Sequence, residues 1–138
     1  MFLVLLKLFA FYRASAASAC QPRLDRWDAA FTRHGRSSAF VFCRQTLEPG
    51  CAFHARMFVP HLRGYEDPAT GSAVASLAGA LLRFAPPGEG EHDFVIELGY
   101  EMGRPSLLTL SVTMHDRELV GAAIGGEAVA VTEGTIDA

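Results

Sequence analysis

The sequence has few cysteines, no surplus of basic residues and no long unbroken apolar run, and each absence excludes a class of protein. An odd count of three cysteines with no C-x-x-C pair argues against a disulfide framework and a cysteine-built zinc site, so we expect a reducing, cytoplasmic location. A net charge of −3 cannot neutralise a phosphate backbone, so nucleic acid is not an expected partner. The N-terminal apolar runs are broken at Lys7 and Arg13. A membrane-spanning helix needs about 18 apolar residues in a row, so no membrane association is expected either.

The histidines and glycines do not show the spacing of common metal or nucleotide sites. His54, His61, His92 and His115 do not fall four residues apart on a helix, and no H-E-x-x-H occurs, so we expect no metal site. The glycine-containing segment 121–126 lies between two strand patterns with no helix after it, unlike a dinucleotide-binding loop.

What the sequence does contain is enough apolar material for one domain. Its 138 residues are 50% hydrophobic and 20% charged, which excludes a disordered chain. Residues 2–7 predict a buried strand followed by a short helix. The small residues from Ala14 to Cys20 leave a second interpretation open, a signal-peptide cleavage site, although Lys7 interrupts the apolar stretch and no charged segment precedes it.

The remaining pattern alternates between short strands and helices. Apolar residues from Leu24 to Phe31 on one face, with Arg33 on the other, predict a helix that ends at Gly35. An almost wholly apolar segment predicts a helix over 72–84 that is buried on all sides. Further strands are predicted over 38–46, 51–59, 93–100, 107–114, 118–124 and 127–132, with turns at 48–50, 115–116 and 125–126. We therefore expect an α/β (α+β) fold, a mixed sheet curled around one central helix.

The polar segment before the second long helix, Tyr65 to Ala73, is the most informative part of the chain. Pro68 pushes Asp67 into an extended conformation, and Gly71 allows a ligand to approach the backbone closely. The first turn of a helix offers free N–H groups and the positive end of the helix dipole, which suit a carboxylate.

Two interpretations of this segment follow from the residues alone. Thr70 or Ser72 can cap the helix, so the segment can be a turn and a capped helix start with no ligand. Alternatively, Asp67 beside an anion site can accept a hydrogen bond from a ligand or take part in acid/base chemistry.

Three motifs, in order and at ordinary spacing, resemble the C-terminal half of the PhzF-type phenazine biosynthesis family: Arg56–Phe58, Glu66–Ala73 and Met102–Ser106. A weaker resemblance extends back to about residue 2. This family shares its fold with diaminopimelate epimerase, with two α/β domains that each wrap a mixed sheet around a central helix. The resemblance implies that residues 1–138 form a single domain, one half of such a fold, with the active site facing the other half.

The resemblance also implies a function. Family members are isomerases that move a proton on a small carboxylated substrate without metal or organic cofactor. The motif aspartate corresponds to Asp67 and the motif serine to Ser72, which we expect to be catalytic. The expected substrate-binding residues are Thr70, Gly71, Ser72 and Ala73. Diaminopimelate epimerases have a cysteine in place of this serine, so racemisation by two thiols is not expected.

One departure from the family pattern limits this expectation. The family's general acid/base glutamate and an assisting histidine lie in the first domain, and no segment here resembles its E-x-M-P-F-A-G-H-A motif. The resemblance therefore implies that this chain supplies the carboxylate-binding half of the cleft, lacks the N-terminal catalytic half and is inactive by itself. The expected partners are a small carboxylate and either a second copy of the chain or the missing half. The alternative is a non-catalytic remnant of a truncated gene that binds small acids.

Overall fold

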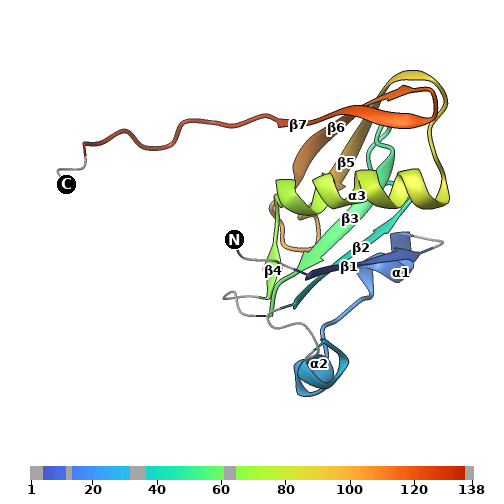
Figure 1. Ribbon diagram of the computed structural model, residues 1–138. Coiled ribbons are helices and arrows are strands. Elements are labelled where there is room, and N and C mark those ends of the chain that lie inside the picture. Colours follow the sequence, from blue (N-terminus) through green and yellow to red (C-terminus); the bar gives the residue numbers. More distant parts are fainter. Residues whose placement is uncertain (1–4, 12–13, 32–36, 61–64, 136–138) are drawn as a thin grey trace.

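One mixed β-sheet organises the chain. The computed structural model describes residues 5–11, 14–31, 37–60 and 65–135. The strands are β1 (Leu5–Phe11), β2 (Ser37–Cys43), β3 (Phe53–Phe58), β4 (Glu66–Asp67), β5 (Gly90–Leu98), β6 (Ser106–His115) and β7 (Glu118–Gly126). The helices are α1 (Ala14–Ser18), α2 (Leu24–Phe31) and α3 (Gly71–Phe84). Helix α3 crosses one face of the curled sheet, which confirms the predicted fold class (Figure 1).

The strand order is β1-β2-β3-β5-β6-β7, and the short β4 pairs with β3 beside this path. The pairs β1–β2 and β3–β5 are parallel, whereas the other neighbours are antiparallel. A parallel pair needs a crossover connection, and α3 provides it between β3 and β5. Among the described residues, no helix has the length and hydropathy needed to cross a membrane.

Strand β3 separates the two faces of the sheet because successive side chains of a strand point to opposite sides. Phe53, Ala55 and Met57 belong to the apolar core under α3. His54 and Arg56 point to the opposite face, where α1 and the loop after β5 cover them. The core under α3 also contains buried residues of β2, β5 and β6: Phe40, Ile96, Leu98, Leu108, Leu110 and Val112.

Helix α3 is buried along one stripe rather than on all sides. Its buried residues are Ala73, Val74, Leu77, Ala78 and Leu81. Ala75 and Gly79, on the other side of the helix, are exposed. The prediction of complete burial is therefore wrong, because the sheet of this chain covers only one side of the helix.

The C-terminal part of the sequence differs most from the prediction. The predicted strand over 127–132 pairs with no strand among the described residues, and Figure 1 shows this segment running away from the body. Val129 and Val131 are 84% and 89% exposed. The turn predicted at 125–126 is also wrong, because both glycines belong to β7, paired with β6. An alternating pattern identifies a strand-forming segment but not its partner.

Two smaller boundaries also differ from the prediction. The N-terminal strand is present from Leu5 and extends to Phe11, and α1 follows it as the predicted short helix. The predicted strand residues 2–4 and the predicted helix end at Gly35 lie outside the described residues. The β6–β7 turn lies at Asp116 and Arg117, whose φ angles of 50° and 65° suit a tight hairpin turn.

The burial of Leu77 on α3 leads to a stability prediction. Leu77→Ala removes a fully buried side chain and leaves a cavity, so it should lower the free energy of unfolding by about 2–5 kcal/mol. The matched control is Leu47→Ala, because Leu47 is 54% exposed and its loss should change stability by about 0.5 kcal/mol or less. Urea denaturation measures both, and equal losses would contradict this packing.

Candidate functional site

Asp67 and Thr70 close the loop between β4 and α3. Thr70 Oγ1 donates to Asp67 Oδ2 at 2.6 Å, and the Ala69 N–H donates to Asp67 Oδ1 at 3.4 Å. Thr70 occupies the N-cap position of α3, but its side chain makes no capping hydrogen bond. The hydroxyl group of Thr70 therefore orients the Asp67 carboxylate instead of capping the helix.

The first turn of α3 leaves part of its hydrogen-bonding capacity open. The N–H groups of Ala73 and Val74 donate to the Thr70 carbonyl at 3.1 and 3.2 Å. Within the described part of the chain, no acceptor is found for the N–H groups of Gly71 and Ser72. Of the N–H groups expected to face a ligand, that of Ala73 is thus already bonded, and those of Gly71 and Ser72 remain.

A cavity of about 530 Å³ lies beside this turn, within the size range of small-molecule sites. Its lining comes from the loop before α3, the start of β6 and the end of β7: Ala69, Gly71, Pro105, Ser106, Leu107, Leu108, Ile124, Gly125, Gly126 and Glu127. Ser72 is exposed and is not part of this lining. A Cβ atom at Gly71 would meet Ile124 at 3.8 Å, an ordinary contact, so internal packing does not require glycine there.

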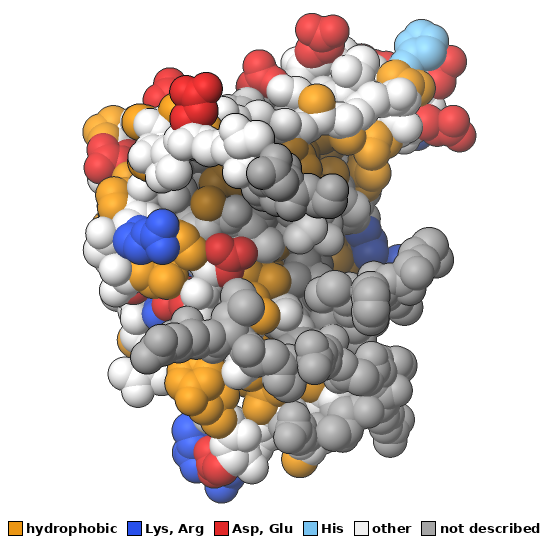
Figure 2. Space-filling view, turned by 90° about the vertical axis from the view of Figure 1, so that its left-hand side faces the viewer, with side chains coloured by type: hydrophobic (Ala, Val, Ile, Leu, Met, Phe, Trp, Pro, Cys, Tyr) orange, Lys and Arg blue, Asp and Glu red, His pale blue; other side chains and the backbone are white. Residues whose placement is uncertain are grey.

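Figure 2 views the molecule from the side on which the C-terminal segment leaves the body in Figure 1. Acidic side chains gather in the upper part of this view, and hydrophobic side chains are scattered over the rest. Among the described residues on this face, Lys and Arg side chains form no broad basic surface. The start of α3 offers the positive end of the helix dipole to an anionic ligand.

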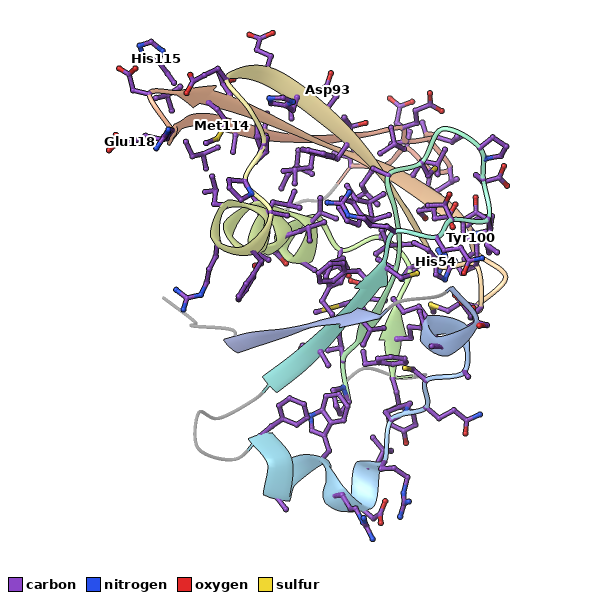
Figure 3. The ribbon with its side chains drawn as sticks, turned by 90° about the vertical axis from the view of Figure 1, so that its right-hand side faces the viewer. His54, Asp93, Tyr100, Met114, His115 and Glu118 are labelled. Atoms are coloured by element: carbon purple, nitrogen blue, oxygen red, sulfur yellow. The ribbon has the colours of Figure 1, made fainter. Side chains whose placement is uncertain are left out.

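Behind the sheet lies a buried polar cluster that the sequence analysis did not predict. The fully buried His54 contacts two carboxylates, Glu97 Oε1 from Nδ1 at 2.8 Å and Glu101 Oε1 from Nε2 at 2.9 Å. Both ring nitrogens thus face carboxylate oxygens. His54 also lies beside Tyr100, far from the hairpin that carries His115 and Glu118 (Figure 3).

The two carboxylates of this cluster have further donors. Glu97, which is fully buried, accepts the N–H groups of Leu47 and Glu48 at 2.6 and 2.8 Å. Glu101 accepts Ser18 Oγ at 2.5 Å. Burial alone would raise the pKa of Glu101, but the hydrogen bonds from Ser18 and His54 lower that pKa below its usual value.

Arg56 extends the cluster to β4. Its Nε and Nη2 donate to the two carboxylate oxygens of Glu66, both at 2.9 Å, and both side chains are nearly buried. Burial alone would lower the pKa of Arg56, but the Glu66 carboxylate raises it, so the guanidinium stays charged. Glu66 is therefore held in an ion pair, and Asp67 beside it is the carboxylate next to the start of α3.

One sequence signal could have revealed this cluster. The predicted strand over 51–59 carries His54 and Arg56 two residues apart between apolar residues, so both must share one face. Two basic side chains on an otherwise buried strand require acidic partners, since an unpaired buried charge is costly. The sequence does not show which glutamates these partners are.

The cysteines, the remaining histidines and Arg104 show no arrangement that indicates a site among the described residues. Burial raises the pKa of the thiols of Cys20, Cys43 and Cys51, which keeps them protonated and weakly nucleophilic. Among the described residues, no group of three or more metal-ligating side chains could hold an ion, and His61 lies outside them. The Arg104 side chain is exposed, while its N–H closes a turn on the Gly99 carbonyl at 2.9 Å.

The lowered pKa of Glu101 leads to a prediction about acid stability. A folded-state pKa below the unfolded value contributes stability at neutral pH that is lost as the pH falls through the folded pKa. Glu101→Gln should therefore make the free energy of unfolding less dependent on pH between about pH 5 and pH 3. Glu118→Gln, at an exposed position on the β6–β7 hairpin, is the control. Parallel curves for the wild-type protein and Glu101→Gln would contradict the assignment.

Comparisons with known proteins agree on one family. The sequence matches the phenazine biosynthesis-like protein family, PhzC-PhzF, over residues 8–134. An uncharacterized isomerase of Mesorhizobium japonicum is 45% identical over 121 residues, which cover 88% of this chain and 38% of that protein. The trans-2,3-dihydro-3-hydroxyanthranilate isomerase of Pseudomonas fluorescens is 34% identical over 87 residues, 63% of this chain and 31% of the enzyme.

A solved structure shows the same fold. The PhzF-family phenazine biosynthesis protein of Bacillus anthracis superimposes with a TM-score of 0.71 at 18% identity, over 85% of this chain and 40% of that one. This chain thus spans less than half the length of the relatives it matches. Given a family match over residues 8–134, the chain belongs to the phenazine biosynthesis-like (PhzF-type) protein family, whose relatives here include proteins named as isomerases.

Proposed function

We propose that this chain supplies the carboxylate-binding half of the cleft of a PhzF-type isomerase, which moves a proton on a small carboxylated substrate without a cofactor. The observation that carries the proposal is the start of α3. There the N–H groups of Gly71 and Ser72 lack acceptors among the described residues, and the loop that presents them lines a cavity of about 530 Å³. The isomerase names of the relatives support the reaction class.

The physics of a helix start supports a carboxylate as the ligand. Unpaired N–H groups and the helix dipole together attract an anion, and α3 has fourteen residues over which peptide dipoles align. Donors held in place before the reaction also stabilise the negative charge that develops when a proton leaves the carbon next to a carboxylate. Gly71 and Ser72 are thus proposed to bind the substrate and to make its carbon more acidic.

Asp67 is proposed to orient the substrate through a polar group other than its carboxylate. Its carboxylate already accepts Thr70 Oγ1 at 2.6 Å, which fixes its direction and leaves further lone pairs for a ligand. Thr70 is then a residue that positions Asp67, and Ala73 contributes through the backbone that continues the helix.

The proposal places the general acid/base outside this chain. Glu66 is held by Arg56 and Asp67 by Thr70, so neither carboxylate beside the site is arranged as a mobile base. These contacts also favour the second candidate, a domain that binds small acids without converting them. The two proposals agree on binding and differ in whether the missing half of the relatives restores turnover. Self-association of the chain stays a prediction in either case.

The first test concerns binding by Ser72. We expect 3-hydroxyanthranilate to shift the amide NMR signals of Gly71 and Ser72, while 2-aminophenol, which lacks the carboxylate, should not. Ser72→Ala keeps the backbone N–H group but removes the hydroxyl group, which we propose also donates to the carboxylate, so it should weaken this binding about three- to tenfold. Ser76→Ala is the matched control, because its hydroxyl group donates to the Ser72 carbonyl inside the helix at 3.0 Å. Binding of both compounds alike would contradict a carboxylate site.

The second test concerns catalysis. Proton exchange on trans-2,3-dihydro-3-hydroxyanthranilate in D₂O, followed by NMR, should be negligible with the isolated chain. Loss of a positioned general acid/base costs about 10²–10⁴-fold in rate. Adding the unmatched portion of the Mesorhizobium relative should restore exchange if the chain is an isomerase half. In that mixture Asp67→Ala should lower kcat, unlike Asp93→Ala at an exposed site on β5. Rapid exchange by the isolated chain would mean that it contains its own base.

A further inference from the structure

Two residues that line the cavity beside α3 lie in loops rather than in α3 or the sheet. The first wall is Ala69, which follows β4, and β4 is only two residues long and pairs with β3 at Met57 and Phe58. The second wall is Pro105, at the end of the loop that connects β5 to β6. The sheet by itself therefore does not fix the distance between these two walls.

Arg56 contacts a glutamate next to the first loop and another in the second loop. Its bidentate bond to Glu66 holds the residue that directly precedes Asp67 in β4. Its Nε also lies 3.7 Å from Glu101 Oε2, in the loop that leads to the second wall. Arg56 Nη1 donates to the carbonyls of Ala17, Ser18 and Cys20 at 3.1, 2.8 and 2.9 Å, which anchors the guanidinium to α1 and the residues after it.

The two loops also touch each other, at Gly99 and Pro68. Gly99 has a φ of +76°, and a Cβ atom there would lie 2.9 Å from Pro68 Cβ and 2.2 Å from the Arg104 carbonyl oxygen. Glycine is therefore required at this contact, and a shift of β4 would pass through Pro68 to the turn from Gly99 to Arg104.

We propose that Arg56 is a positioning residue that sets the separation of the two cavity walls through Glu66 and Glu101. The proposal rests on the proposed function only in treating this cavity as the ligand site. A lysine cannot replace the arginine, because an ammonium group lacks the planar fork that bonds both oxygens of one carboxylate while it donates to carbonyl groups on another side. Losing the fork releases β4, and the position of Asp67 changes with it.

The main test is Arg56→Lys, read first without ligand. We expect the amide NMR signals of the loops that carry both walls, residues 69–70 and 99–104, to shift together. Affinity for 3-hydroxyanthranilate should fall about tenfold, as expected when a hydrogen bond to an anion is misplaced. Arg23→Lys is the matched control, because Arg23 makes the same forked contact with Asp25, at 3.0 and 2.9 Å, on an exposed surface away from the cavity.

Glu66→Gln distinguishes a positioning role of Arg56 from a purely structural one. It is also the variant to measure if Arg56→Lys does not fold. It keeps the bonds of Arg56 to α1 but breaks the charged fork, so the wall signals should shift while those of residues 14–20 stay in place. Shifts confined to residues 14–20 in Arg56→Lys, with unmoved walls in Glu66→Gln, would overturn the proposal.

The two proposals fail separately. If 3-hydroxyanthranilate does not bind to the wild-type chain, while both variants shift the NMR signals of both walls, the proposed function fails and the positioning role stands. If the wild-type chain and both variants bind 3-hydroxyanthranilate equally well and the NMR signals of the walls do not shift, the positioning role fails and the proposed carboxylate site stands.

Discussion

The Arg56 guanidinium joins three segments that are far apart in the sequence: α1, β4 and the loop after β5. All three of its nitrogens are occupied, by Glu66 on one side and by backbone carbonyls on the other. A buried charge that loses its partner costs several kcal/mol, about 3–5 in measured cases, so these segments can separate only at a high cost. The loop that carries Asp67 thus depends on a side chain that does not touch the cavity.

This arrangement is possible because β3 has two different faces. Its odd-numbered residues from Phe53 to Met57 complete the apolar core under α3, while His54 and Arg56 lie in a polar layer behind the sheet. The polar layer is fully bonded, since no buried side-chain nitrogen or oxygen atom within the described residues lacks a partner. Satisfied networks of this kind favour one packing arrangement over its competitors.

The candidate ligand site at the start of α3 is held less firmly than the polar layer on the other side of the sheet. Helix α3 is fixed by its apolar stripe, so its first turn has a definite position against β6 and β7. The loop before it depends on the Asp67–Thr70 hydrogen bond and on the ion pair below. The helix start is rigid, and the loop that carries Asp67 is held by different contacts. This arrangement is suited to binding an anion at the helix start while the loop orients another group of the ligand.

Local spacing and motifs were enough to locate most of the segments and to identify the family. Period-two and helical patterns located β2, β3, β5, β6 and α3 to within a few residues, because local spacing alone decides which side chains share a face. The motifs from Arg56 to Phe58 and from Glu66 to Ala73 pointed to the PhzF-type family, which the comparison with the family confirms.

Which segments become partners depends on how the whole chain packs. Within the described residues, segment 127–132 has no strand partner and one side of α3 is exposed. The Ala73 N–H, which the sequence suggested was free, donates to the Thr70 carbonyl. The packing also brings Glu97 and Glu101 to His54, residues more than 40 positions apart. Spacing along a chain defines faces, but ion pairs and strand partners form across long loops, where only the packing of the whole sheet determines which groups meet.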